Sequence, residues 1–240
     1  MSHSTIILLV LTILLIATLT RSTLGFGDAL VAMPLLTLTV GIHIAVPVVA
    51  LMGVTIGLVI AINNWRDIDF AAAWQLVLAS ALGVPIGLLL LWTAPEAWVK
   101  GILGILLILF SIYALTRPAL PQIEAQHWAY SLGFISGILG GAYNINGPPI
   151  VIYGTLRRWS PASFRVTLQG YFVPSFFFIA LGHGITGLWT PDVVQLYLAA
   201  LPLIFIAIYF GGKLNRRIPV ERFTRLLHIA LIVLGALLLI

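Results

Sequence analysis

The chain has 240 residues, of which 61% are hydrophobic and 8% charged, with 12 Lys and Arg against 7 Asp and Glu. A soluble domain carries about 25% charged residues, so these charges cannot cover a globule of this size, and a water-soluble monomer is excluded. Eight spans of about 20 residues would use roughly 160 residues. The composition therefore predicts an all-α polytopic membrane protein, in which residues 1–240 form a single transmembrane domain of about eight helices.

Several function classes are excluded by missing residue types and motifs. The chain has no cysteine, which excludes disulfides, thiolate metal sites and a catalytic cysteine. Its basic residues lie between apolar runs, a pattern typical of cytoplasmic membrane loops and not of nucleic-acid binding. No Walker A, G-x-S-x-G or H-E-x-x-H sequence is present, and the five His residues are scattered. We therefore expect no catalytic residue, no metal and no cofactor, and any transport should be secondary unless a partner supplies ATP hydrolysis.

The apolar stretches follow one another at residues 5–20, 29–62, 70–92, 98–116, 128–156, 164–184, 192–210 and 223–240. The N-terminus lacks the positive segment and cleavage site of a signal peptide, so the first stretch should be a retained span. Two regions hold too much apolar sequence for plain helices. They contain the clusters Gly25-Phe26-Gly27-Asp28 and Asn144-Ile145-Asn146-Gly147-Pro148-Pro149. Because Gly destabilises a helix by about 1 kcal/mol and Pro by about 3 kcal/mol, a broken helix is expected at each cluster.

The distribution of Lys and Arg predicts the orientation. With a first turn near residues 39–43, one side of the membrane receives only Arg66 and Arg117. Cytoplasmic loops carry the excess of positive charge, so both termini should lie outside the cytoplasm, in a bacterial-type inner membrane. The side predicted to be cytoplasmic receives nine basic residues, which are Lys100, Arg157, Arg158, Arg165, Lys213, Arg216, Arg217, Arg222 and Arg225.

The sequence also indicates an internal duplication, with residues 1–117 as the first repeat and 118–240 as the second. At an offset of 124 residues, Trp65 aligns with Trp189, Gly87 with Gly211, and Pro95 with Pro219, and the two clusters correspond at an offset of 119. Duplicated halves with paired broken segments are typical of transporters whose site lies at the repeat interface and whose halves rock against each other.

The second cluster is the stronger candidate for a binding site. Unwound backbone at membrane depth is tolerated only where protein buries it or where it lines a wet cavity. The prolines are placed to begin a half-helix, whose N-terminus favours anions, and the two Asn amides can donate to them. Asn144, Asn146, Gly147 and Pro148 are therefore predicted to bind substrate. The alternative is a tightly packed kink in which the amides cap the helix.

The first cluster adds Gly25 and Gly27 as candidate binding residues and contains an acidic group. Asp28 could carry protons for coupling, since a carboxylate at membrane depth is usually functional, or it could be a fixed N-cap of the following helix; an ionised Asp28 would repel an anion. Arg21 either lies deep in the bundle as a partner of Asp28 or of the substrate, or is a cytoplasmic surface charge. Gln169 in the sixth span is the remaining candidate.

Two sets of phrases in the chain resemble the twin motifs of the sulfite exporter TauE/SafE family. They are Leu24-Gly25-Phe26-Gly27 with Pro34-Leu35-Leu36, and Gly137-Ile138-Leu139-Gly140-Gly141 with Gly147-Pro148-Pro149-Ile150. The resemblance covers nearly the whole chain and implies about eight spans, duplicated halves and transport of sulfite or organosulfonates across the bacterial inner membrane. Asp28, Asn144 and Asn146 depart from it, because they stand where the family is expected to have Gly, and this puts the substrate in question.

Two functions follow as hypotheses. The first is a secondary transporter that exports a small sulfur-containing anion, bound between the two broken helices near the midplane. The second is a non-transporting accessory or scaffold protein whose breaks serve helix packing. A membrane enzyme is disfavoured, because no nucleophile–base pair is visible. The expected partners are the lipid bilayer, the anion and protons, and a homo-oligomer is compatible with the sequence.

Overall fold

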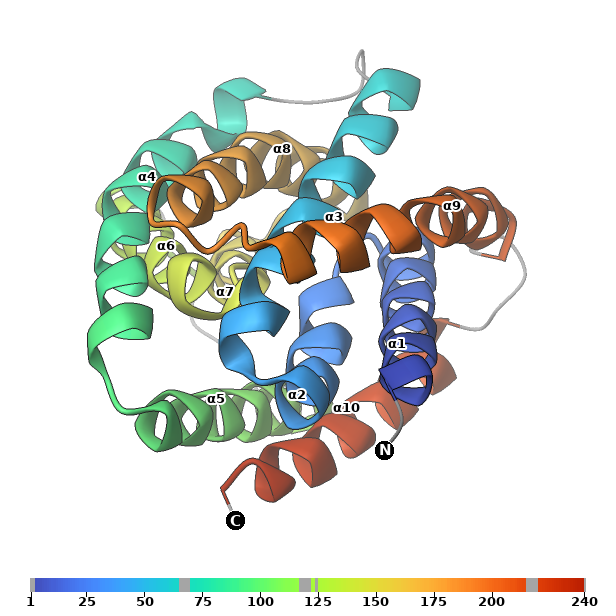
Figure 1. Ribbon diagram of the computed structural model, residues 1–240. Coiled ribbons are helices and arrows are strands. Elements are labelled where there is room, and N and C mark those ends of the chain that lie inside the picture. The colour runs from blue at the N-terminus through green and yellow to red at the C-terminus, as the bar shows by residue number, and fades with distance from the viewer. Residues whose placement is uncertain (1–2, 65–69, 117–121, 124, 215–219, 240) are drawn as a thin grey trace. The chain divides into compact units, whose positions relative to one another are not determined.

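The computed structural model describes residues 3–64, 70–116, 122–123, 125–214 and 220–239. All regular elements in these ranges are α-helices, which confirms the all-α class (Figure 1). The helices are α1 (His3–Leu24), α2 (Asp28–Val40), α3 (Ile42–Asn64), α4 (Phe70–Thr93), α5 (Glu96–Thr116), α6 (His127–Tyr143), α7 (Gly147–Leu156), α8 (Pro161–Ile185), α9 (Pro191–Leu214) and α10 (Val220–Leu237).

Six of the helices in the described ranges are long and apolar enough to cross a membrane, as a polytopic protein requires. These spans are Ser4–Leu24, Ile42–Ile62, Ala73–Thr93, Glu96–Thr116, Thr167–Ile185 and Pro191–Lys213. Helix α2 is apolar but shorter, and α6 and α7 have 17 and 10 residues. The predicted count of eight spans therefore stays a prediction.

The long apolar regions are divided at the expected places. Helix α1 ends at Leu24 and α2 begins at Asp28, while α6 ends at Tyr143 and α7 begins at Gly147. The turn expected near residues 39–43 occurs at Gly41, whose φ of 80° is favourable for glycine alone. Apolar sequence thus forms the helices, and local glycine and proline chemistry sets where they end.

The helices form two compact units, and the first point at which the chain passes from one unit to the other falls within α3. Unit 1 consists of residues 1–52, 94–118 and 188–240, and unit 2 consists of residues 53–93 and 119–187. In unit 1, α1 packs against α9 and α2, and α5 lies beside α10 (Figure 1). In unit 2, α4 packs against α6 and α8, and α6 also contacts α7 and α8. Each unit thus contains helices from both predicted repeats.

Glycines bring α4 and α6 into close contact within unit 2. A Cβ atom added to Gly133 would lie 2.7 Å from the carbonyl oxygen of Leu76. The same helix face carries Gly137 and Gly141, which would meet backbone of α4 in the same way. Small residues at every fourth position let helices approach closely in lipid, where van der Waals packing replaces the hydrophobic effect.

Unit 1 contains two contacts of the same kind. In the α5–α10 pair, a Cβ on Gly104 would lie 2.6 Å from the carbonyl oxygen of Gly235, and a Cβ on Gly235 would lie 2.7 Å from that of Gly104. In the α1–α9 pair, a Cβ on Gly211 would collide with the side chain of Ser22. Tight helix packing in both units therefore depends on the absence of a side chain.

The residues used to align the repeats can be compared only in part, since Trp65 and Pro219 lie outside the described residues. The pair Gly87 and Gly211 can be compared. Gly87 on α4 faces the end of α6, and Gly211 on α9 faces the end of α1, so each lies against a helix that ends at a glycine-rich interruption. The duplication stays a prediction, which this parallel supports.

Replacing Gly104 by Ala should destabilise the protein by about 1–3 kcal/mol, because the new methyl group overpacks the backbone of α10. Gly101→Ala, one turn earlier on α5, is the matched control, since nothing lies within 4 Å of its added Cβ. The control should be neutral or slightly stabilising because Ala forms helix better than Gly. The midpoints of thermal unfolding in detergent test this, and equal midpoints for the two variants would contradict it.

Candidate functional site

The first interruption, in unit 1, is built from glycines in conformations that other residues avoid. Gly25 has a φ of 88° and Gly27 a φ of 99°, values that an L side chain rarely adopts. The N–H of Gly25 donates to the carbonyl of Arg21 at 2.7 Å, which closes the last turn of α1. The chain then reverses into α2 within three residues.

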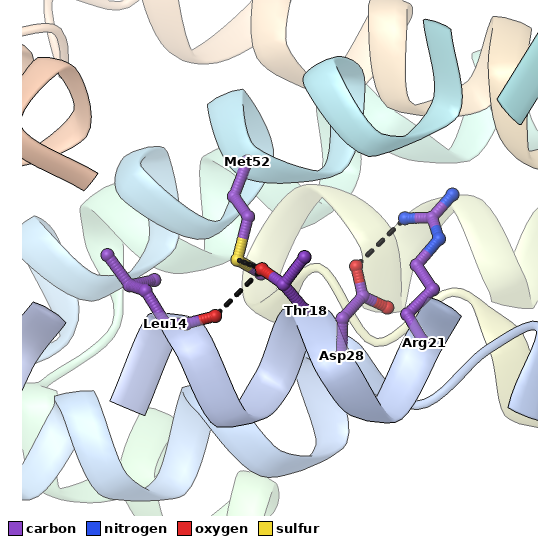
Figure 2. Close-up of polar contacts among 5 residues, drawn as sticks. All are labelled: Leu14, Thr18, Arg21, Asp28 and Met52. Carbon is purple, nitrogen blue, oxygen red and sulfur yellow. Dashed lines mark hydrogen bonds and ion pairs between the residues drawn. The ribbon is translucent and has the colours of Figure 1, made fainter. Parts of the chain in front are cut away.

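A buried ion pair spans this interruption. Nη1 of Arg21 lies 2.8 Å from Oδ2 of Asp28, and the two side chains are 0% and 5% exposed. Figure 2 shows the two side chains pointing toward each other, with Thr18 one turn earlier on α1 donating to the carbonyl of Leu14 at 2.7 Å and lying 3.4 Å from the sulfur of Met52. Arg21 is therefore a buried partner of Asp28 and not an exposed surface charge.

The interpretation of Asp28 as an N-cap is wrong. Helix α2 begins at Asp28 itself, its N-cap is Gly27, and no side-chain capping hydrogen bond is formed there. The carboxylate instead accepts from Arg21, while its position in the first turn still suits the positive end of the helix dipole. The ion pair also weakens the repulsion that Asp28 alone would exert on an anion, because the guanidinium of Arg21 compensates the carboxylate charge.

The second interruption, in unit 2, depends on one left-handed asparagine. Asn144 follows α6 with a φ of 56°, and its N–H donates to the carbonyl of Gly140 at 2.8 Å. Asn is one of the few residues that adopt this conformation without great strain. Ile145 and Asn146 lead to α7, and both Asn side chains are buried, with about 1% of each residue exposed.

The start of α7 offers fewer backbone donors than the sequence suggested. Gly147, Pro148 and Pro149 form its first turn, and proline has no N–H, so Gly147 supplies the one backbone N–H among these three residues. Asn146 is the N-cap, yet its side chain makes no capping bond. Its Nδ2 atom is buried and has no hydrogen-bond partner among the described residues.

A chain of hydroxyl groups that sequence reasoning missed holds this interruption. Ser136 of α6 donates to the backbone carbonyl of Asn146. Its Oγ lies 2.7 Å from the hydroxyl of Tyr171 on α8, which lies 3.0 Å from Oγ of Ser80 on α4. All three side chains are buried. Helical spacing could have indicated Ser136, because Ser136, Gly140 and Asn144 recur every four residues and share one face of α6 and its end; it gives no signal for Tyr171 or Ser80.

Gln169 lies on α8, the helix that carries Tyr171. It is buried, and its Oε1 atom has no hydrogen-bond partner in the part of the chain that is described. Phe172, three residues later and on the same face, lies 3.6 Å from a Cβ built on Gly147. This face of α8 therefore passes the start of α7. His183, at the end of α8, donates from Nε2 to the carbonyl of Gly141 at 3.0 Å.

The predicted site residues thus fall into two groups. Arg21, Gly25, Gly27 and Asp28 belong to unit 1, whereas the second group belongs to unit 2 and consists of Asn144, Asn146, Gly147, Pro148 and Gln169. That the two interruptions converge stays a prediction from the sequence. Within the described residues, no three His, Asp or Glu side chains gather where they could hold a metal ion.

Comparison with known proteins identifies the chain's relatives. The family model described as sulfite exporter TauE/SafE matches residues 9–238. The probable inner membrane transporter protein TsaS of Comamonas testosteroni is 24% identical over 174 residues, which is 72% of this chain and 73% of that protein. No solved structure matches the chain.

The buried ion pair yields a test with a matched control. Arg21→Gln leaves Asp28 buried without its counter-charge and should lower the free energy of unfolding by about 3–5 kcal/mol. The double variant Arg21→Gln/Asp28→Asn should be less destabilised than the sum of the two single variants, because no uncompensated charge remains.

The exposed pair of Lys100 and Glu96 is the control, since its atoms lie 2.7 Å apart with 32% and 47% of the side chains exposed. Lys100→Gln should cost at most about 1 kcal/mol. Denaturant unfolding followed by Trp fluorescence measures each value, and strict additivity of the Arg21 and Asp28 effects would show that the two groups are not coupled.

Proposed function

The chain belongs to the sulfite exporter TauE/SafE family of membrane transporters, and we propose that it exports a small sulfur-containing oxyanion, sulfite or an organosulfonate, by secondary transport. The family model covers nearly the whole chain, and the relative from Comamonas testosteroni is named as a probable inner membrane transporter. No Walker A motif is present in the sequence, which favours secondary transport over ATP hydrolysis by this chain.

One observation carries the proposed binding site: the amide of Asn146 is buried at the start of α7 and its Nδ2 makes no hydrogen bond among the described residues. A buried donor without a partner costs free energy, so a site that retains one is suited to a ligand that accepts. The positive end of the α7 dipole favours an anion there. Asn144, Gly147, Pro148 and Gln169 complete this part of the proposed site.

The first interruption has a different proposed role. Arg21 and Asp28 form a compensated pair at the start of α2, and the conformations of Gly25 and Gly27 place that pair. Protonation of Asp28 would release the guanidinium of Arg21 to an anion, so proton coupling through Asp28 and anion binding by Arg21 form one proposed step. The alternative is that Arg21 and Asp28 stay paired throughout, in which case the ion pair only stabilises the fold.

Liposome flux tests the proposed site. Asn146→Leu should lower the rate of sulfite or taurine efflux at least about tenfold, since hydrogen bonds to charged groups contribute about 1.5–3 kcal/mol each. Gln75→Leu makes the same amide-to-leucine change on α4, at a partly exposed residue, and should leave flux unchanged. If Asn146→Leu alters neither flux nor the thermal shift induced by the anion, the site lies elsewhere.

Orientation is proposed from the sequence, with both termini outside the cytoplasm of an inner-membrane protein. The chain has no cysteine, so a single introduced cysteine is the one thiol in the protein that can be labelled. Cysteine at Arg158 should react with a membrane-impermeant maleimide only after cells are opened, whereas cysteine at Thr190 should react in intact cells whose outer membrane is permeable. The reverse pattern would place the termini in the cytoplasm.

A further inference from the structure

Helix α7 runs back along α6, as contacts at both of its ends show. At its start, Ser136 in the middle of α6 donates to the carbonyl of Asn146. At its end, the N–H of Ile123 donates to the carbonyl of Leu156 at 3.0 Å, and Nη1 of Arg157 donates to the carbonyl of Ile123 at 3.5 Å. Ile123 precedes α6 by four residues. The segment that leads into α6 therefore meets the segment that leaves α7, and all these residues belong to unit 2.

The two helices cannot together form one interrupted span. If α6 and α7, of 17 and 10 residues, followed each other in line, they would extend about 40 Å and end on opposite sides of a hydrocarbon core about 30 Å thick. Ile123 is bonded to the end of α7, and the four residues from Ile123 to the start of α6 reach at most about 14 Å. The start of α6 and the end of α7 therefore lie on the same side of the core.

The length of α7 gives the depth of the interruption. Its 10 residues extend about 15 Å, about half the thickness of the core. Arg157 and Arg158 follow its last turn, and charged side chains are costly inside the membrane, so this end of α7 lies at the membrane surface. Asn146 then lies near the midplane, which is the depth at which the sequence predicts the binding site.

We infer that α6 and α7 form a re-entrant hairpin, which enters and leaves the membrane on the cytoplasmic side and carries the second interruption at its tip. Non-helical backbone at this depth must be buried in protein or line a wet cavity, and both Asn144 and Asn146 are buried. The inference goes beyond the proposed function, since the hairpin is the same whatever the chain transports. It changes the predicted topology, because the segment before α6 moves to the side of the segment after α7.

Unit 1 contains a hairpin of the same form. Three residues separate α1 from α2, and α2 packs against α1 (Figure 1); helices joined by so short a connection are antiparallel neighbours. Three described helices follow each hairpin, α3 to α5 in the first repeat and α8 to α10 in the second. With one crossing by each of them, every repeat crosses the membrane an odd number of times, so the second repeat is inverted relative to the first. Inverted repeats with broken helices are typical of secondary transporters.

The basic residues provide an independent check of this topology. Along the chain it assigns ten of the twelve Lys and Arg residues to one side of the membrane, all except Lys100, which falls on the other side, and the buried Arg21. The topology predicted from the sequence assigns nine to one side and two, Arg66 and Arg117, to the other. Both of these two lie outside the described residues. Since cytoplasmic loops carry the excess of positive charge, the hairpin topology fits the sequence better, and it keeps both termini outside the cytoplasm.

Ala97 and Ala125 distinguish the two topologies, because each residue changes sides between them and both are exposed. Single cysteines at these positions are labelled with the membrane-impermeant maleimide, and Arg158→Cys and Thr190→Cys are the controls, since the two topologies agree on their sides. Ala125→Cys should react only after cells are opened, like Arg158→Cys. Ala97→Cys should react in intact cells whose outer membrane is permeable, like Thr190→Cys.

Each outcome decides one part of the inference. Ala125→Cys that reacts in intact cells overturns the hairpin, and Ala97→Cys that reacts only after opening overturns the inverted repeats. Gln122→Cys and Thr93→Cys change exposed residues of the same two segments and should react like Ala125→Cys and Ala97→Cys, respectively. They keep the test decisive should either alanine variant not reach the membrane.

Discussion

Backbone groups that cannot reach water must find partners within the protein, and this constraint governs both interruptions of the apolar helices. At the first, the N–H of Gly25 bonds to the carbonyl of Arg21, and at the second, the N–H of Asn144 bonds to that of Gly140. Each preceding helix therefore closes in the same way, four residues back. The carbonyl of Asn146 instead takes its bond from a side chain, that of Ser136. The second interruption thus depends on residues of other turns for its conformation, and this ties its geometry to the hydroxyl chain.

The two interruptions differ in the kind of polar group that they bury. In unit 1 a full positive and a full negative charge compensate each other across 2.8 Å, and breaking such a buried pair costs far more than forming it gains. In unit 2 the buried groups at the interruption are neutral amides and hydroxyls. Neutral donors lose less on burial than charges do, so they can stay unpaired until a ligand arrives. This difference is the reason to propose unit 2 for binding of an anion, and Arg21 and Asp28 for proton coupling.

The helix ends and the membrane class could be predicted, because the sequence features that determine them are local. The helix ends at Leu24 and Tyr143 follow directly from the glycines and prolines beside them, and the apolar composition is enough to predict the membrane class. Partners distant in sequence could not be predicted in the same way. Ser136 and Tyr171 are 35 residues apart, and nothing in either neighbourhood indicates that α8 brings one hydroxyl to the other. The sequence also left the role of Arg21 open, because burial of a charge depends on helices that pack much later in the chain.

If the chain is a duplication, each contact between a helix of the first half and a helix of the second half should have a counterpart between the two corresponding helices. If α1–α5 correspond to α6–α10, the contact of α9 with α1 is the counterpart of that of α4 with α6, and both are present, the first within unit 1 and the second within unit 2. Both use a glycine on the later helix of its half, Gly211 in one case and Gly87 in the other, set against the final turns of the helix that precedes an interruption. Since α5 would correspond to α10, the contact between these two helices has no separate counterpart. There Gly104 and Gly235 face each other's carbonyl oxygens. The local glycines and prolines end each helix, and the paired glycines Gly87 and Gly211 hold a neighbouring helix close to those last turns. If the two halves are a duplication, this packing is a reason for both to retain glycine at these positions, although one interruption contains buried charges and the other neutral amides.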